Sequence, residues 1–216
     1  MNIIFFLILV SVVGTTNMFS QVFVNNVERV GTVVLDYCVD DKGKRYNIVV
    51  NQEKSTYKDE GWQLGCVESF KKAELIYPMK MTNDCWQQVY YFVNENLKTK
   101  SLSEEEQKLC KAFHSGIYKY HNPAYINTKI VRRKKKQIEK TEFKDQRQVY
   151  EINWVADHIY TLKTLKLPLA KDKHKIGGLI KVEIIEVLNE NTYLYKSYRT
   201  DLEDSNTVYG LISKVK

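Results

Sequence analysis

Apolar and polar residues alternate in two stretches near the start of the chain, at residues 31–39 and 45–50. A period of two is typical of strands that bury one face. The polar stretch 40–44 (DDKGK) separates the two, and Gly43 can adopt the positive φ that tight hairpin turns require. The pattern therefore predicts a β-hairpin over residues 31–50.

The next apolar residues recur at helical spacing. Asp59 and Glu60 suit the start of a helix, and Pro78 marks its end or lies just beyond it. Between them lies one apolar stripe, made of Trp62, Cys66, Val67, Phe70, Ala73 and Leu75. Residues 85–93 (CWQQVYYFV) are rich in the aromatic and β-branched residues of strands. We expect a ββαβ module in which the helix covers one face of the sheet.

The second half of the chain contains short segments of strand-like composition. Turn-forming pairs such as Asn122-Pro123 and Gly177-Gly178 separate most of them. The predicted strands are 117–120, 128–134, 137–141, 148–154, 158–165, 179–188, 192–198 and 208–215. Eight such strands predict an antiparallel meander, closed or half-closed as a barrel. Ahead of them, Ser101 or Ser103 can cap a short helix that runs through Leu109.

The predicted helix and strands make this an α+β protein. Its 216 residues suit one or two domains, and a composition of 44% hydrophobic and 27% charged residues is that of a globular chain. Residues 1–110 carry 12 basic and 14 acidic side chains, whereas residues 111–216 carry 21 basic and 12 acidic ones. This shift places a boundary near residues 100–110. We expect a first module over 21–97, a polar helical linker over 98–110, and a basic β-domain over 111–216.

The first 20 residues have the pattern of a secretory signal peptide. Residues 3–13 are apolar except for Ser11, and the small Ser20 precedes Gln21 at a suitable cleavage position. This run is shorter than the roughly 20 residues that cross a bilayer, although an uncleaved N-terminal anchor is an alternative. We therefore expect a periplasmic or secreted protein, for which an anionic membrane surface or a glycan is a more natural partner than nucleic acid.

An exported chain with an even number of cysteines suggests disulfides. The four cysteines, Cys38, Cys66, Cys85 and Cys110, allow three pairings. A bond from Cys38 on the first strand to Cys66 on the covering helix is sterically reasonable, and Cys85 would then pair with Cys110. Free buried thiols are the alternative. A zinc site is not expected, because no closely spaced Cys-x2-Cys pair occurs.

The hairpin, helix and closing strand together resemble the TonB C-terminal domain family. The resemblance rests on the pattern G-T-V-V-x4-V-D-x2-G-K-x2-N-I-x-V over residues 31–50, followed by the helix near 62–73, Pro78 and the third strand. It covers about residues 28–97. It implies a periplasmic fold that pairs an exposed strand with a peptide of an envelope protein. The Tyr-Pro segment and Pro-rich spacer of that family do not occur, so energy transduction is not implied.

Strand addition to a sheet edge would use the backbone of the third strand. We therefore expect the edge-strand site to contain Trp86, Gln88, Tyr90 and Phe92. The alternative is that this strand is protected or pairs with the second domain.

A run of five basic residues, Arg132, Arg133, Lys134, Lys135 and Lys136, is a further candidate site. Alternate residues of a strand point to opposite faces, so these five cannot all face a core. The run is either a solvated hairpin between Ile130 and Ile138 or a patch that binds anions or membrane surfaces. Heparin or vesicle binding that weakens with salt would indicate the patch.

Signatures of catalysis do not occur. The chain has no Gly-x-Ser-x-Gly motif, P-loop or dinucleotide fingerprint, and its four histidines lack metal-site spacing. Residues 110–120 resemble the start of small secreted Bacteroidetes-type proteins, some labelled "DNA topoisomerase IV", but nothing here supports topoisomerase chemistry. We expect no enzymatic activity and no cofactor.

The sequence thus predicts an exported envelope protein that binds a peptide or protein through its first module. The alternative is a lipocalin-like carrier whose β-domain encloses a small ligand between tyrosine-rich strands such as 193–195. A wide, lined cavity would favour the carrier, and a filled barrel with a bare edge strand would favour the peptide binder.

Overall fold

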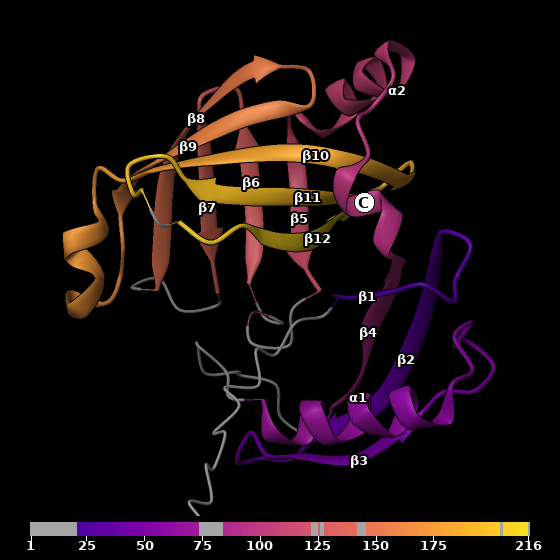
Figure 1. Ribbon diagram of the computed structural model, residues 1–216. Helices are drawn as coiled ribbons and strands as arrows, with labels where there is room; N and C mark the ends of the chain where they lie inside the picture. The colour runs from indigo at the N-terminus through magenta and orange to yellow at the C-terminus, as the bar shows by residue number, and fades with distance from the viewer. Residues whose placement is uncertain are drawn as a thin grey trace, which may run out of the picture.

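The computed structural model describes residues 21–73, 84–121, 125, 128–141, 146–203 and 205–215. The chain forms a four-stranded sheet followed by a closed eight-stranded barrel, with a few short helices. In Figure 1 the barrel strands, coloured rose to yellow, stand above the first sheet, coloured indigo to purple. The prediction of a β-rich α+β protein is confirmed. The predicted signal peptide, residues 1–20, lies outside the described residues.

The first sheet contains the predicted hairpin. Its strands are β1 (Gln21–Val24), β2 (Val30–Val39), β3 (Arg45–Val50) and β4 (Asp84–Asn94), in the spatial order β1-β4-β2-β3. In the turn between β2 and β3, the Asp40 carboxylate accepts hydrogen bonds from the backbone N–H groups of Lys42 (2.9 Å) and Lys44 (2.7 Å). Gly43 has a φ of 77°, as the turn pattern predicts.

The predicted helix is α1 (Glu60–Lys72), and it packs on β3 and β2 (Figure 1). Asp59 caps its start by accepting a hydrogen bond from the Trp62 backbone N–H at 2.9 Å. Cys66 and Phe70 of the predicted stripe are buried, but Trp62 remains 42% exposed. The continuation of the stripe at Leu75, and Pro78, lie outside the described residues.

Strand β4 is not the outermost strand of the sheet, contrary to the expectation from the sequence. It pairs along its whole length with antiparallel β2, and β1 pairs in parallel with its last part, Tyr91–Asn94. Phe92 therefore has strand partners on both sides, which was not expected because the four residues of β1, next to the predicted leader, were not recognised as a strand. Within the described residues, 84–90 of β4 therefore have a strand partner on one side only.

The disulfide of this sheet differs from the expected pairing. Cys38 is bonded to Cys85, and Cys66 and Cys110 are free and buried. The reason is the strand order, since β2 and β4 are neighbours and Cys38 lies directly opposite Cys85 in their register. Cys66 on α1 and Cys110 beside the barrel belong to separate clusters of buried side chains.

The connection from the sheet to the barrel contains η1 (Glu95–Thr99), α2 (Glu104–Leu109) and η2 (Cys110–Phe113). Ser103 and Glu106 form a capping box at the start of α2, as the sequence predicts for one of two serines. This segment is more than a linker, because Leu102, Cys110 and Phe113 are buried against barrel residues.

The barrel is an up-and-down meander in which each strand pairs with the next in sequence and the last pairs with the first. Its strands are β5 (Gly116–Tyr120), β6 (Lys129–Arg133), β7 (Lys136–Lys140), β8 (Arg147–Ala156), β9 (Ile159–Lys166), β10 (Leu179–Asn189), β11 (Thr192–Arg199) and β12 (Val208–Val215). A short η4 (Ala170–Lys175) lies between β9 and β10. The predicted meander is confirmed, and closure leaves it no open edge.

The sheet and the barrel share an apolar interface. Val93 of β4 is fully buried against the outer faces of β10, β11 and β12, where it meets Ile185, Leu194 and Leu211. Beside this cluster, the buried Glu186 of β10 forms ion pairs with Arg29 and, at 2.5 Å, with Lys100. The charged network therefore ties the first sheet and the connection to one wall of the barrel.

Candidate functional site

The two ends of the barrel differ in how they are filled. At the end nearest α2, Phe113, Tyr118, Ile130 and Tyr193 form a closely packed core with almost no exposed surface. The Tyr118 hydroxyl donates a hydrogen bond to the backbone carbonyl of Phe113 at 2.9 Å. The segment after α2 thus closes this end, and a cavity lies inside the barrel toward the opposite end.

Arg132 lies inside this closed half, with only 1% of its surface exposed. Its guanidinium donates hydrogen bonds to the Phe113 carbonyl (3.0 Å), the Tyr193 hydroxyl (3.1 Å) and the Tyr160 hydroxyl (2.9 Å). The same group lies 4.6 Å from the ring centroid of Tyr160 and 4.8 Å from that of Tyr118. A buried cation is therefore held by neutral acceptors and by aromatic rings.

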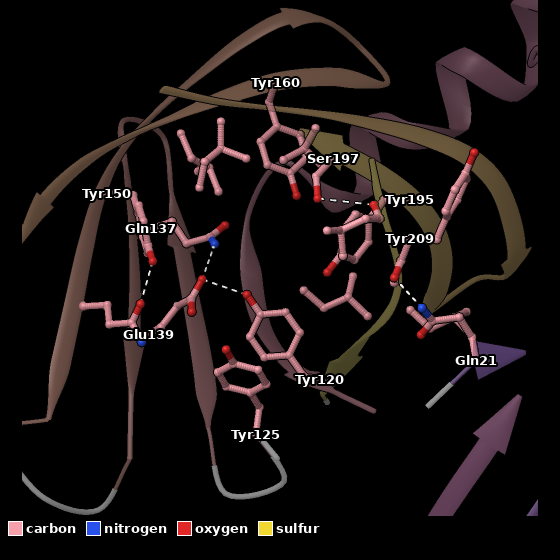
Figure 2. Close-up of a pocket in the computed structure, with 18 residues that line it drawn as sticks. Gln21, Tyr120, Tyr125, Gln137, Glu139, Tyr150, Tyr160, Tyr195, Ser197 and Tyr209 are labelled. Carbon is pink, nitrogen blue, oxygen red and sulfur yellow. Dashed lines mark hydrogen bonds between the residues drawn. The ribbon is translucent and has the colours of Figure 1, made fainter. Parts of the chain in front are cut away.

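A cavity of about 270 Å³ occupies the other half of the barrel (Figure 2). Its lining is rich in tyrosine and contains one carboxylate, several amides and a group of aliphatic side chains. The described residues that line it are Gln21, Tyr120, Tyr125, Gln137, Glu139, Gln148, Tyr150, Tyr160, Leu162, Ile180, Val182, Tyr195, Ser197, Val208, Tyr209, Gly210, Leu211 and Ile212. The space is close to the lower limit of small-molecule pockets.

Glu139 projects from β7 into this cavity and is 5% exposed. One of its oxygens, Oε1, accepts hydrogen bonds from the Tyr120 hydroxyl and from Gln137 Nε2, each at 2.8 Å. Its other oxygen, Oε2, accepts no hydrogen bond from the part of the chain that the structure describes. Burial raises the pKa of Glu139, while the bonds from Tyr120 and Gln137 and the positive charge of Arg132 act against that rise.

Several tyrosine side chains surround the same space. The rings of Tyr120 and Tyr125 lie 5.6 Å apart between centroids, and Tyr195 lies across the cavity from them (Figure 2). The Tyr150 hydroxyl donates a hydrogen bond to Gln148 Oε1 at 2.6 Å. Burial raises the pKa of Tyr120 and of Tyr195 well above the usual value, so these phenols stay neutral.

The first sheet contributes to the rim of the cavity. Gln21, the first residue of β1, donates a side-chain hydrogen bond to the Tyr209 carbonyl on β12. Phe23 packs edge-on against the Tyr209 ring, with centroids 5.0 Å apart. Next to Tyr209 on β12, Gly210 leaves room for Tyr195, because a Cβ at this position would overlap the Tyr195 hydroxyl. The sheet and the barrel therefore shape this opening together.

The structure separates the predicted basic patch into two parts. Arg132 is buried in the barrel, so it is not part of an accessible patch. The other four residues, Arg133, Lys134, Lys135 and Lys136, are exposed at the β6–β7 hairpin. A second hollow, of about 480 Å³, lies there between Lys134, Lys135 and the stacked rings of His114 and Trp154. Binding of an anionic membrane surface or glycan at this tip stays a prediction.

The four residues expected at the sheet edge have different surroundings. Tyr90 and Phe92 are buried in the core beneath α1, and Trp86 is 41% exposed. Gln88 is buried and donates a hydrogen bond to the backbone carbonyl of His121, just after β5, at 2.6 Å. Only Trp86 therefore offers a large accessible side chain beside the half-paired part of β4.

The described residues contain no cluster of three or more His, Cys, Asp and Glu side chains that could hold a metal ion. His114 and His158 flank Asp157 at the closed end of the barrel, His121 lies at the interface with the first sheet, and His174 is exposed on η4.

The cavity residues were largely missed from the sequence. Of the lining, only Tyr195 belongs to the tyrosine-rich stretch that the sequence singled out as a possible ligand wall. Glu139 and Gln137 drew no attention because both stand in a short strand with ordinary alternation. The sequence places Gln137 and Glu139 on one face of this strand and Ile138 on the other. Assigning the polar face to the barrel interior would have identified both residues.

No helix in the described ranges has the length and apolar character needed to cross a bilayer. Comparisons of the chain with protein-family models, with curated proteins and with solved structures find no match.

Proposed function

We propose that this protein binds and carries a small molecule in the cavity of its barrel. The observation that supports this most directly is the contrast between the two barrel ends. One end is packed shut around Arg132, whereas the other keeps a space of about 270 Å³ lined by tyrosines and one carboxylate. A barrel that needed only a stable core would be expected to fill both ends with side chains.

The lining suits recognition more than simple filling. Binding sites in proteins combine apolar and aromatic walls with a few polar groups that fix orientation. Here Leu162, Ile180 and Val182 supply an apolar wall, and Glu139 presents a carboxylate oxygen toward the space. The volume corresponds to about nine water molecules at roughly 30 Å³ each, so it suits a ligand with a single ring.

The test uses three single-ring compounds of different charge: 2-phenylethylamine, 2-phenylethanol and phenylacetate. Each is titrated into the purified protein and followed by NMR. We expect at least one to bind, and we expect Val182→Phe to remove that binding because the larger side chain fills the cavity. Val155→Phe is the matched control, since Val155 lies on the outer face of β8 and is 65% exposed.

Binding that Val182→Phe abolishes and Val155→Phe leaves unchanged supports the proposal. If none of the three compounds binds in a manner sensitive to Val182→Phe, the carrier function is contradicted.

We also propose that the carrier acts without enzymatic chemistry, at the cell envelope or outside the cell after cleavage near Ser20. The Cys38–Cys85 bond is compatible with such a compartment, where disulfides persist. N-terminal sequencing of the exported protein tests the cleavage site.

A second candidate function is binding of an envelope peptide by strand addition, through a module of the TonB C-terminal type. The observation in its favour is that residues 84–90 of β4 have a strand partner on one side only within the described residues. Peptides selected from a displayed library should then protect the amides of residues 84–90 from hydrogen exchange. Protection elsewhere, with none on β4, would contradict this second function.

A further inference from the structure

The charges around the cavity constrain what it can hold. Among the described lining residues there is no Lys, Arg or His, and Glu139 is the one acidic side chain. Arg132 belongs to the closed half, where the Phe113 carbonyl, Tyr193 and Tyr160 accept hydrogen bonds from its terminal nitrogens. Its third nitrogen, Nε, donates a hydrogen bond to Gln137 Oε1 at 3.0 Å. A ligand in the cavity therefore meets a carboxylate without meeting the cation.

The two oxygens of Glu139 are not equivalent. Oε1 already accepts two hydrogen bonds, from Tyr120 and from Gln137. Oε2 accepts none from the described residues and belongs to a side chain that lines the space. Neither Tyr120 nor Gln137 occupies this oxygen, so a ligand that brings a charged N–H donor to Oε2 gains a strong hydrogen bond.

The aromatic residues near Glu139 suit the same kind of ligand. Tyr120 donates to Glu139, and its ring lies 5.6 Å from the Tyr125 ring. Figure 2 shows both rings and Glu139 beside one another at the edge of the cavity. Ring faces attract cations, and this barrel already holds the Arg132 guanidinium 4.6 Å from the Tyr160 centroid.

We propose that the ligand is a small organic cation, a protonated amine on an apolar or aromatic body, with its nitrogen between Glu139 Oε2 and the rings of Tyr120 and Tyr125. The body of the ligand lies against the aliphatic side of the cavity, at Leu162, Ile180 and Val182. This inference rests on the proposed carrier function and adds the charge class of the ligand. An anionic ligand would face Glu139, and the described lining residues offer it no cation.

The same three compounds test the inference, because they share one ring and differ in charge. In the unchanged protein at neutral pH, we expect 2-phenylethylamine to bind at least about tenfold more tightly than 2-phenylethanol, and phenylacetate to bind most weakly. Equal binding of the amine and the alcohol, or tighter binding of phenylacetate, at a site that Val182→Phe removes overturns the inference. That result leaves the carrier function intact, whereas loss of all such binding contradicts the carrier function itself.

The Glu139→Gln variant tests whether the preference for the amine comes from the carboxylate of Glu139. The amide can still accept hydrogen bonds from Tyr120 and Gln137, but it has no negative charge. We expect the affinity for 2-phenylethylamine to fall at least about tenfold and that for 2-phenylethanol to change less than about twofold. Glu151→Gln on the exposed face of β8 is the control and should change neither affinity. An unchanged amine affinity in Glu139→Gln overturns the inference, and the order of the three affinities in the unchanged protein tests it without the Glu139→Gln variant.

Discussion

Arg132 and Glu139 lie in the same barrel interior, and Gln137 joins them where a direct ion pair would be expected. The Gln137 carbonyl oxygen accepts a hydrogen bond from Arg132 Nε at 3.0 Å, and its Nε2 donates to Glu139 Oε1 at 2.8 Å. The amide keeps the two charges apart and leaves one carboxylate oxygen facing the cavity. The cation thus stabilises the closed half of the barrel while the carboxylate serves the open half.

Glu139→Gln should change how stability depends on pH. Burial raises the pKa of Glu139 in the folded protein above the value of about 4.3 in an unfolded chain. As pH rises through the window from about 4.3 to the higher pKa of the folded state, the unfolded state loses a proton that the folded state retains, so the wild type loses stability. Each pH unit of the window contributes about 1.4 kcal/mol.

Urea unfolding at pH 4 and pH 7 measures this effect. The variant should gain stability relative to the wild type at pH 7 and match it more closely at pH 4. Glu151→Gln, on the outer face of the barrel, should show no such difference. A Glu139→Gln variant that loses stability at pH 7 would contradict the assignment.

Arg132→Ala should destabilise the protein strongly. It removes the Arg132 donors to the Phe113 carbonyl, Tyr160 and Tyr193, and leaves a hole among Tyr118, Tyr160 and Tyr193. The expected loss is about 3–5 kcal/mol in the free energy of unfolding, by comparison with other buried charged groups that lose their network. Arg133→Ala is the control, because this neighbour is exposed and should change stability by less than about 0.5 kcal/mol. Similar losses for the two variants would show that Arg132 is not buried.

The cysteines should react unequally. Peptide mapping without reduction should recover Cys38 linked to Cys85, and the folded protein should resist alkylation at Cys66 and Cys110, because burial raises the pKa of each thiol to about 12. Replacing Cys38 and Cys85 together by Ser should lower the free energy of unfolding by about 2–4 kcal/mol. Recovery of a Cys38–Cys66 peptide would contradict the strand order of the first sheet.

His121 should make the protein sensitive to acid. Burial, helped by nearby Lys119, lowers the pKa of His121 to about 3, whereas an unfolded chain has a value near 6.5. The unfolded state therefore takes up a proton first as pH falls below about 6.5, and stability decreases from there toward pH 3. In His121→Gln, the loss of stability between pH 7 and pH 4.5 should be smaller than in the wild type. His174→Gln, at an exposed position, should behave as the wild type.

The fold was predictable where a single strand or helix carries its own pattern. The hairpin turn at Gly43, the cap at Ser103 and the barrel strands all follow from local spacing and turn chemistry. The short strand β1 was not predictable in this way, since four residues give too little alternation. Its omission is why β4 was expected to have one open side along its whole length, whereas Tyr91–Asn94 pair with β1.

The candidate site depends on relations between strands that the sequence does not display. Alternation showed that the five basic residues could not all face one way, but only the barrel register reveals that Arg132 is the one turned inward. In β7 the usual rule that apolar side chains face the interior fails, because Gln137 and Glu139 face inward while Ile138 faces out. A polar set faces inward here because it meets Arg132 and Tyr120 from neighbouring strands.

The shared apolar cluster at Val93, Ile185 and Leu194 has a consequence for how the molecule comes apart. A chain cut between the sheet and the barrel would expose these side chains on both fragments and leave the carboxylate of Glu186 without Arg29. Calorimetry of the intact protein should accordingly show a single melting transition in place of two, and neither half should be recovered as a soluble fragment.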